Sequence, residues 1–254
     1  MLSANYEPTN LTLSEIVKDN FRTAAVFEKY NLDFCCNGKR TLADACTEKG
    51  INSEDIINEI KNLSSSEAKE EIRPDDWELD FLVSYIINNH HSYVNRMLPV
   101  ISAHTQKVAS KHGENHPETK QIAEIFASIN VEMKHHMMKE EKILFPHIIK
   151  LVGLSGYGVG ESIPYFGTIK NPIAMMEAEH QSAGDRMFEI RNLTNNYTLP
   201  EDACETYKIT LKELKEFEED LHKHVHLENN ILFPKAIKIE ESLFNEQIKN
   251  YEKR

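Results

Sequence analysis

The chain lacks the features that would place it in a membrane or on nucleic acid. No apolar run among its 254 residues approaches the roughly 20 residues that a membrane-spanning helix needs. Its first residues show no charged-then-apolar pattern, so no secretory signal peptide is expected. Positive charge is also scarce, since 29 Lys and Arg stand against 41 Asp and Glu for a formal net charge of −12. Nucleic acids and anionic lipids need a basic face, so we expect neither as a partner.

Cysteine, glycine and proline are sparse as well. Four cysteines, two of them adjacent as Cys35 and Cys36, do not resemble a secreted disulfide framework, and a cytoplasmic location is expected. Nine glycines and nine prolines beside many Glu, Lys, Ile and Leu favour helix over sheet. Because 40% of the residues are apolar, the chain can bury a real core. The expected fold class is all-α.

The first 63 residues predict a small N-terminal helical domain that contains Cys35 and Cys36. Residues 11–30 carry apolar side chains at helical spacing. A second helical pattern ends on Gly50, a natural C-terminal stop, and Ser53 can cap a third. Residues 64–76 have no periodicity, a charge run and a proline, so they are expected to be a linker.

Four longer helical patterns predict an antiparallel four-helix bundle over residues 77–240. We expect these helices from about 75 to 112 with a bend at Pro99, from 117 to about 152, from about 172 onward, and from about 200 to 240. Residues 153–167 hold five of the nine glycines and are expected to connect the two halves. Residues 241–254 are charged and are expected to form a frayed tail.

One pattern of a histidine and a carboxylate occurs twice in the second part of the chain. Aligned on Ile-Leu-Phe-Pro, both copies read His-x-x-x-Glu-x-x-Ile-Leu-Phe-Pro. His136 and Glu140 form the first pair, and His224 and Glu228 form the second. Residues four apart lie on one face of a helix, so each pair can point at one spot.

A lone histidine precedes each pair at nearly the same distance. His91 comes 45 residues before His136, and His180 comes 44 residues before His224. Each half of the bundle therefore supplies one histidine from one helix and a His-x-x-x-Glu from the next. This pattern indicates an internal duplication of a helical hairpin.

A single His-x-x-x-Glu is usually an ordinary surface pair, but two copies in register favour a metal site. Each copy comes one turn before an apolar Ile-Leu-Phe, so it should face the bundle interior. Unsatisfied burial of four imidazoles and two carboxylates would cost many kcal/mol, and metal ions would satisfy them. The expected ligands are His91, His136, Glu140, His180, His224 and Glu228.

Six ligands exceed the four of a tetrahedral zinc and suit two ions, with Glu140 and Glu228 as bridges. A shared oxo or hydroxo bridge would leave each ion one open position. Imidazole with carboxylate favours iron, with manganese or zinc as alternatives.

The other histidines are expected to stay outside the first coordination shell. His112 lies 21 residues after His91, about 31 Å along a straight helix, too far to share one central site. Glu132 or Glu179 could hold the second N–H of a ligand histidine or relay protons. The histidines that flank the ligands are expected on a solvated face or in the second shell: His90, His135, His222 and His226. The methionines are expected in the bundle core.

Several stretches together resemble the iron–sulfur cluster repair di-iron proteins, the repair-of-iron-centres family. They are MMKEEKILFP, MEAEHQSAG, LENNILFP and the N-terminal DFCCNGKRTLADAC. The resemblance covers nearly the whole chain and implies a cysteine-bearing N-terminal domain joined to a hemerythrin-like bundle. The family's ligand pattern falls on the same six residues, and a further family histidine matches His112. The glycine-rich connection looks longer than in the family and could alter access to the metals.

The resemblance implies a role in restoring iron–sulfur clusters damaged by nitrosative or oxidative stress, through iron donation or nitric oxide handling. Its partners would be damaged or apo iron–sulfur proteins, with nitric oxide or O2 as a small ligand. Two alternatives remain open: a nitric oxide or peroxide reductase at the di-iron site, and a hemerythrin-like sensor that binds O2 or NO without turnover.

The vicinal cysteines are candidates for a thiol role. Cys35 and Cys36 precede a helix expected to begin at Thr41, and a helix N-terminus lowers a thiol pKa. The alternative is a buried pair that behaves as an apolar side chain, and the resemblance favours redox or nitrosyl handling. Cys46 and Cys204 are expected to be structural.

Overall fold

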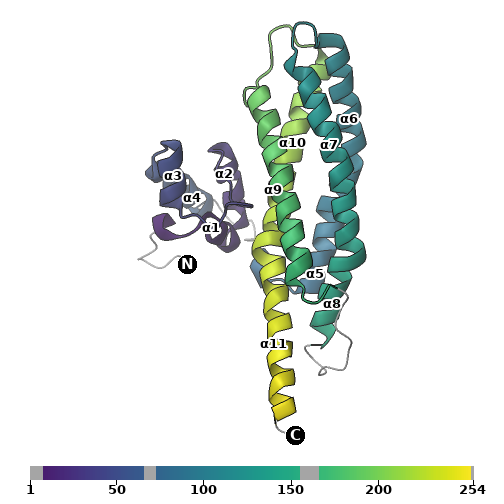
Figure 1. Cartoon of the computed structure of the whole chain (residues 1–254). Coiled ribbons are helices and arrows are strands. Elements are labelled where there is room, and N and C mark those ends of the chain that lie inside the picture. The colour runs from purple at the N-terminus through teal and green to yellow at the C-terminus, as the bar shows by residue number, and fades with distance from the viewer. Residues whose placement is uncertain (1–7, 66–72, 155–165, 253–254) are drawn as a thin grey trace. The chain divides into compact units, whose positions relative to one another are not determined.

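A computed structural model describes residues 8–65, 73–154 and 166–252, and in these ranges the chain is helical without strands (Figure 1). An isolated bridge joins Thr12 and Thr41. The contacts divide the chain into two compact units, Met1–Glu78 with His222–Pro234, and Leu79–Leu221 with Lys235–Arg254. The segment His222–Pro234 also forms the middle of the last helix of the bundle, which runs on without a break. The expected all-α class is confirmed.

Four short helices make up the N-terminal domain: α1 (Leu13–Asp19), α2 (Ala24–Lys29), α3 (Leu42–Lys49) and α4 (Ser53–Ser65). A capping box between Thr12 and Glu15 starts α1. Gly50 ends α3 in the left-handed conformation, with φ at 64°, as expected from its place in the sequence. The expectation that Ser53 caps α4 is wrong, because the side chain of Asn52 accepts the backbone N–H of Glu54 at 3.1 Å.

The bundle helices follow, three of them interrupted by a π-helical segment. The first bundle helix consists of α5 (Leu79–Tyr85), η4 (Ile86–His91) and α6 (Ser92–His112). The second consists of α7 (Glu118–Lys139), η5 (Glu140–Leu144) and α8 (Phe145–Leu154), and the third is α9 (Lys170–Leu193). The fourth consists of α10 (Glu205–Leu227), η6 (Glu228–Leu232) and α11 (Phe233–Glu252).

Two of the expected helix boundaries are wrong. The first bundle helix begins at Leu79 because Pro74–Asp76 form a separate 3-10 turn and Trp77 is extended. The fourth continues beyond residue 240 to Glu252, and Leu243 is still buried on it, so apolar packing carries the helix past the expected end. Pro99 lies inside α6. The glycine-rich connection and the expected linker fall mainly at 155–165 and 66–72, outside the described residues.

The long helices pack as an antiparallel bundle in the order α6, α7, α9, α10 (Figure 1). Aromatic rings fill its core, with Phe126 and Phe217 in edge-to-face contact at 5.4 Å between centroids. Polar side chains also link neighbouring helices. His104 of α6 contacts Glu213 of α10 at 2.7 Å. Arg191 of α9 contacts the buried Glu218 of α10 at 2.9 Å.

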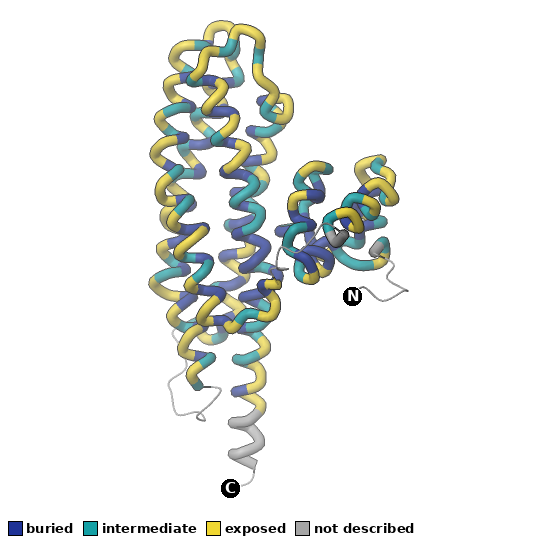
Figure 2. The backbone as a smooth tube through the Cα atoms, turned by 180° about the vertical axis from the view of Figure 1, so that it is seen from behind, coloured by how far each residue is buried: buried dark blue, intermediate teal, exposed yellow. Residues whose placement is uncertain are grey.

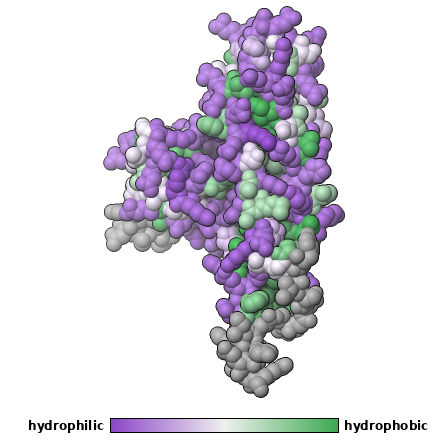
Figure 3. Space-filling view, in the orientation of Figure 1, coloured by the Kyte–Doolittle hydropathy of each residue, from purple (hydrophilic) through white to green (hydrophobic). Residues whose placement is uncertain are grey.

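Burial follows the helical repeat along each bundle helix, with buried residues on the inner side and exposed ones outside (Figure 2). The face seen in Figure 3 is mostly hydrophilic, with apolar residues in small separate patches. None of the described helices is both long enough and apolar enough to cross a membrane.

Candidate metal centre

The six expected ligands come together inside the bundle, each 0 or 1% exposed. His136 lies in the last turn of α7 and His224 in the last turn of α10. His180 lies on α9. The burial confirms that both His-x-x-x-Glu pairs face the interior.

Three of the six residues sit at the edge of a π-helical segment. His91 is the last residue of η4, Glu140 the first of η5, and Glu228 the first of η6. A π segment holds one more residue in its turn than an α-helix, so it shifts which side chains face inward. Such segments occur often at functional sites, and here each one lies where a ligand must point at a common centre.

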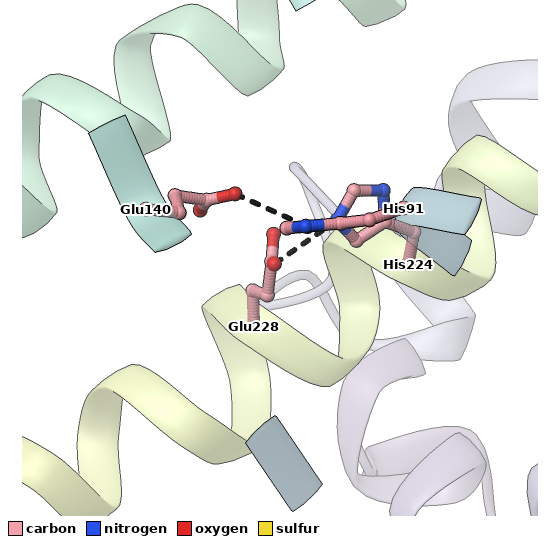
Figure 4. Close-up of side chains that lie close together, drawn as sticks. All are labelled: His91, Glu140, His224 and Glu228. Atoms are coloured by element: carbon pink, nitrogen blue, oxygen red, sulfur yellow. Dashed lines mark hydrogen bonds and ion pairs between the residues drawn. The ribbon is translucent and has the colours of Figure 1, made fainter. Parts of the chain in front are cut away.

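The ligand atoms form two overlapping groups. His91 and His224 share one group with Glu140 and Glu228, and His136 and His180 share the other with the same two carboxylates. Within each group all the ligand atoms lie within 4.8 Å of one another. Figure 4 shows the first group, in which His224 Nε2 lies 3.0 Å from Glu228 Oε1 and His91 Nε2 lies 3.4 Å from Glu140 Oε2.

Two further carboxylates hold the outer nitrogens of ligand histidines. His136 Nδ1 lies 2.9 Å from Glu179 Oε2, and His91 Nδ1 lies 2.9 Å from Glu141 Oε1. Because a carboxylate only accepts, each Nδ1 carries the proton, and in the neutral ring the Nε2 lone pair faces the centre. This is the tautomer that a metal ion requires.

The contacts at the centre bring imidazole nitrogens and carboxylate oxygens close together. His136 Nε2 lies 2.9 Å from His180 Nε2 and 3.3 Å from Glu140 Oε2. One proton can bridge one of these contacts, whereas a cation placed among the atoms satisfies imidazole and carboxylate lone pairs together. Four imidazoles and two carboxylates in these two groups fit metal ions.

Glu179 was one of two candidates for supporting a ligand, and the structure selects it. The hydrogen bond to His136 and the ion pair with Lys139 lower the pKa of Glu179 to about 2. The other candidate is wrong, because Glu132 instead forms an ion pair with Arg186. Sequence reasoning missed Glu141, which has no counterpart at the matching position of the second copy, where Asn229 stands.

A buried aromatic ring packs against the site, and three buried methionines belong to the bundle core. The ring of the buried Phe145 stacks on His91 at 5.6 Å between centroids. Met133 is buried, as expected, and so are Met137 and Met176. Met138 and Met175 are each 52% exposed, so their expected place in the core is wrong. A low-dielectric wall strengthens the interaction between carboxylates and cations inside it.

The flanking histidines have separate partners. His135 is exposed, as expected. His90 is buried with Nδ1 3.0 Å from Asp220, and His222 contacts Glu28 at 2.7 Å. Burial lowers the pKa of His226 to about 3. Neither His90 nor His226 is therefore on a solvated face. His112 is absent from both ligand groups, in agreement with its exclusion on distance.

Cys35 is buried, and Asp33 organises the cysteine loop. The Asp33 carboxylate accepts the backbone N–H groups of Cys35 at 3.1 Å and Cys36 at 3.0 Å, and the Cys35 thiol at 3.2 Å. The contact with the Cys36 sulfur, burial and the Asp33 charge together raise the pKa of Cys35 well above its ordinary value. The helix starts where expected, with Thr41 as the N-cap of α3. The expectation that this helix start lowers the thiol pKa nevertheless fails for Cys35, because the Cys36 sulfur, burial and the Asp33 charge outweigh it.

The loop that carries the cysteines is bonded to the segment His222–Pro234. Asn230 Nδ2 donates to the carbonyl oxygen of Cys35 at 3.0 Å. The ring of Phe34 packs on His226 at 5.6 Å between centroids. Asn230 and His226 thus hold the thiol loop to the same helical segment that carries His224 and Glu228.

Comparison with known proteins agrees with this architecture. Residues 82–236 match the Hemerythrin HHE cation binding domain, more than half of the chain. Residues 9–64 match a Domain of Unknown function (DUF542). By fold and site, the helical bundle is therefore a hemerythrin-like cation-binding domain.

Relatives named as iron–sulfur cluster repair proteins match most of the chain. The iron–sulfur cluster repair protein YtfE of Citrobacter koseri is 34% identical over 228 residues, 89% of this chain and 96% of that protein. The YtfE proteins of Shigella boydii and Escherichia coli have the same identity and coverage. The chain belongs to the family of YtfE-type iron–sulfur cluster repair proteins, as the sequence resemblance indicated.

Proposed function

We propose that the six buried ligands hold two iron ions, with Glu140 and Glu228 as bridges. The observation that carries this proposal is the presence of both carboxylates in both ligand groups. Each ion would then have two imidazoles of its own and two shared carboxylates. The mixed nitrogen and oxygen donors suit iron better than magnesium or calcium, which take oxygen ligands.

We further propose that the protein repairs iron–sulfur clusters damaged by nitrosative or oxidative stress, by donating iron and handling nitric oxide. The relatives named as iron–sulfur cluster repair proteins support this function. A bound iron pair supplies Fe(II)/Fe(III) cycling and an open position for a small ligand such as NO or O2. The partners would be damaged or apo iron–sulfur proteins.

The chain's own residues set the conditions for such chemistry. Glu141 and Glu179 keep the Nδ1 protons of His91 and His136 in place, so the Nε2 atoms stay available to metal. The carboxylates of Glu140 and Glu228, both fully buried, would balance part of the metal charge. Removal of an ion would leave these buried carboxylates without compensation, so release requires protonation or entry of water.

In the same proposal, Cys36 is the thiol that acts on nitric oxide or iron, and Cys35 supports it. Cys36 is half-exposed, whereas Cys35 is buried and its raised pKa keeps it as a thiol. The Asp33 carboxylate and both sulfur atoms lie within 4.8 Å of one another, an arrangement that could hold iron in transit. This role needs reduced cysteines, and we therefore place the protein in the cytoplasm.

Transfer of iron to an apo iron–sulfur protein tests the function. The iron-loaded chain would be mixed with an apo-ferredoxin, sulfide and dithiothreitol, with an iron chelator present to trap free iron. We expect the visible absorption of the cluster to appear with the parent chain and not with Glu140→Ala or Glu228→Ala. The matched control is Glu219→Ala, which removes a partly exposed carboxylate of α10 that pairs with Lys215. Cluster formation that the chelator abolishes would refute direct donation.

Two other measurements distinguish cluster repair from the two alternative functions, a reductase and a binding or sensing module. Steady production of nitrous oxide from nitric oxide, or turnover of peroxide, would identify a reductase. Reversible O2 binding without turnover and without iron transfer would identify a binding or sensing module.

A further inference from the structure

A second cluster of reactive side chains lies at the end of α6, outside the metal centre. His112, the last residue of α6, places its Nε2 3.1 Å from the sulfur of Cys204, which is 92 positions away. A thiol or thiolate at this distance from an imidazole is the pairing found in activated cysteine nucleophiles. His112 therefore has a specific partner that is not a metal ligand.

The position of Cys204 in the chain also favours a thiolate. Cys204 directly precedes α10, a helix of 23 residues, and its carbonyl accepts the N–H of Lys208 at 3.1 Å. Backbone N–H groups of Tyr207 and Thr206 point at its sulfur, and these with the His112 contact lower the pKa of Cys204. The N–H groups of the first helical turn and the helix dipole both stabilise negative charge at this point.

Two histidines lie close together here, His112 and His116, and they bind different partners. His116 is bound at both nitrogens, with Nε2 2.8 Å from Asp202 and Nδ1 3.0 Å from Glu118. His112 Nε2 instead faces the sulfur, while the ring of Tyr207 packs against His112 at 5.3 Å between centroids. Tyr207 is buried, so it fixes the plane of the His112 ring beside the thiol.

Cys204 is exposed to solvent, in contrast to the buried Cys35 and Cys46. The burial of Cys46 agrees with the structural role expected for it. The same expectation for Cys204 is wrong, because an exposed sulfur at a helix start contributes little to a core. Accessibility, a paired imidazole and the N–H groups of a helix start are the features of a cysteine that reacts with small electrophiles.

We propose that Cys204 is a redox modification site whose thiolate, held by His112, forms a reversible mixed disulfide with low-molecular-weight disulfides such as oxidised glutathione. The Cys204 thiolate attacks one sulfur of the small disulfide, a new S–S bond forms, and the original S–S bond breaks. The second half of the small disulfide leaves as a thiolate and takes up a proton. Cys204 is oxidised to the disulfide level, and the released half is reduced to a thiol.

The test uses the full chain and oxidised glutathione at pH 7, with intact mass and peptide mapping to locate the adduct. We expect Cys204 to carry the first glutathione adduct and to react at least about 10-fold faster than in His112→Gln. His104→Gln is the matched control, since it removes another α6 histidine with a single acidic partner, Glu213. Cys204→Ser should lose this adduct and keep the metal content of the parent.

A pH profile separates activation from a structural role of His112. The sulfur itself contacts His112 of α6. The titratable groups around this pair are Tyr207 of α10, whose ring packs on His112, and His116, which binds Asp202 and Glu118. In the parent, the rate should reach half its maximum at a lower pH than in His112→Gln. A Cys204 that reacts no faster than in the urea-unfolded chain, or a rate profile unchanged by His112→Gln, would overturn the proposal.

Discussion

Glu179 of α9 accepts a hydrogen bond from Nδ1 of His136 on α7, at 2.9 Å. The two residues belong to different helices and are 43 positions apart. This bond fixes the ring of a proposed ligand histidine from outside the ligand group, and we therefore expect Glu179 to be a positioning residue whose loss lowers metal affinity.

Replacement of Glu179 by Ala should weaken metal binding by about 10- to 100-fold, the usual effect of removing such a support. The ring of His136 would lose the group that holds its tautomer and orientation. Glu179→Gln should have a smaller effect, because its amide oxygen can still accept the Nδ1–H. Chelator competition gives the affinities. Glu132→Ala is the control, since that carboxylate pairs with Arg186 instead, and equal losses in Glu132→Ala and Glu179→Ala would contradict the assignment.

Loss of either of the two carboxylates proposed as bridges should empty both halves of the proposed metal centre. Glu140 and Glu228 each belong to both ligand groups, so Glu140→Ala or Glu228→Ala removes a ligand from two ions at once. We expect about two irons per chain in the parent and almost none in either variant, measured by elemental analysis of protein purified under identical conditions. Retention of one full equivalent of iron in both variants would show that the carboxylates do not bridge.

Asp33→Asn should make Cys35 more acidic. The Asp33 charge raises the pKa of Cys35, whereas an asparagine oxygen can still accept the two backbone N–H groups of the loop. The thiolate fraction of Cys35 at a given pH should therefore increase. Iodoacetamide labelling as a function of pH, followed by peptide mapping, measures this change. Cys46 serves as the internal reference, and a labelling curve of Cys35 that does not move to lower pH would contradict the role of Asp33.

Asn230→Ala should loosen the cysteine loop. It removes the N–H donor of the buried Cys35 carbonyl, and an unsatisfied buried carbonyl costs about 1–3 kcal/mol. Amide hydrogen exchange should become faster around residues 33–37. Asn130→Ala removes a comparable bond, from Nδ2 to the Ser102 hydroxyl at 2.8 Å, inside the bundle. That variant should lose stability without faster exchange in the cysteine loop.

His116 should make a contribution to stability that disappears at alkaline pH. The Asp202 and Glu118 carboxylates raise the pKa of His116 above its ordinary value of 6.5. The cation is thus favoured in the folded state, and its contribution is complete below that value and is lost as pH rises through the folded pKa. Asp202 stays charged at pH 5.5, since its own pKa is lowered from 3.8.

Melting temperatures at pH 5.5 and pH 8.5 check whether the contribution of His116 to stability falls as pH rises. His116→Gln should melt below the parent at pH 5.5, and the difference should shrink at pH 8.5. Asp202→Asn added to His116→Gln should have little further effect at pH 5.5, because the pair is already broken. A difference that grows with pH would contradict the assignment.

Helical spacing alone predicted which residues of the proposed metal centre lie on the same face of a helix. Two residues four apart on a helix share a face whatever the rest of the fold does, so His136 with Glu140 and His224 with Glu228 could be paired from the sequence. The duplication then supplied His91 and His180, because the two halves repeat nearly the same spacing. Apolar residues after each pair indicated which face would be buried, and the structure places that face inside the bundle.

Tertiary packing decided the contacts between residues that are distant in the chain. Glu141 binds His91 across 50 positions, Asn230 binds Cys35 across 195, and His112 meets Cys204 across 92. No periodicity records such pairs, because they depend on which helices become neighbours and on the rotation that each π-helical segment imposes. Local spacing sets which side chains share a face of one helix, whereas only the folded bundle sets what that face meets.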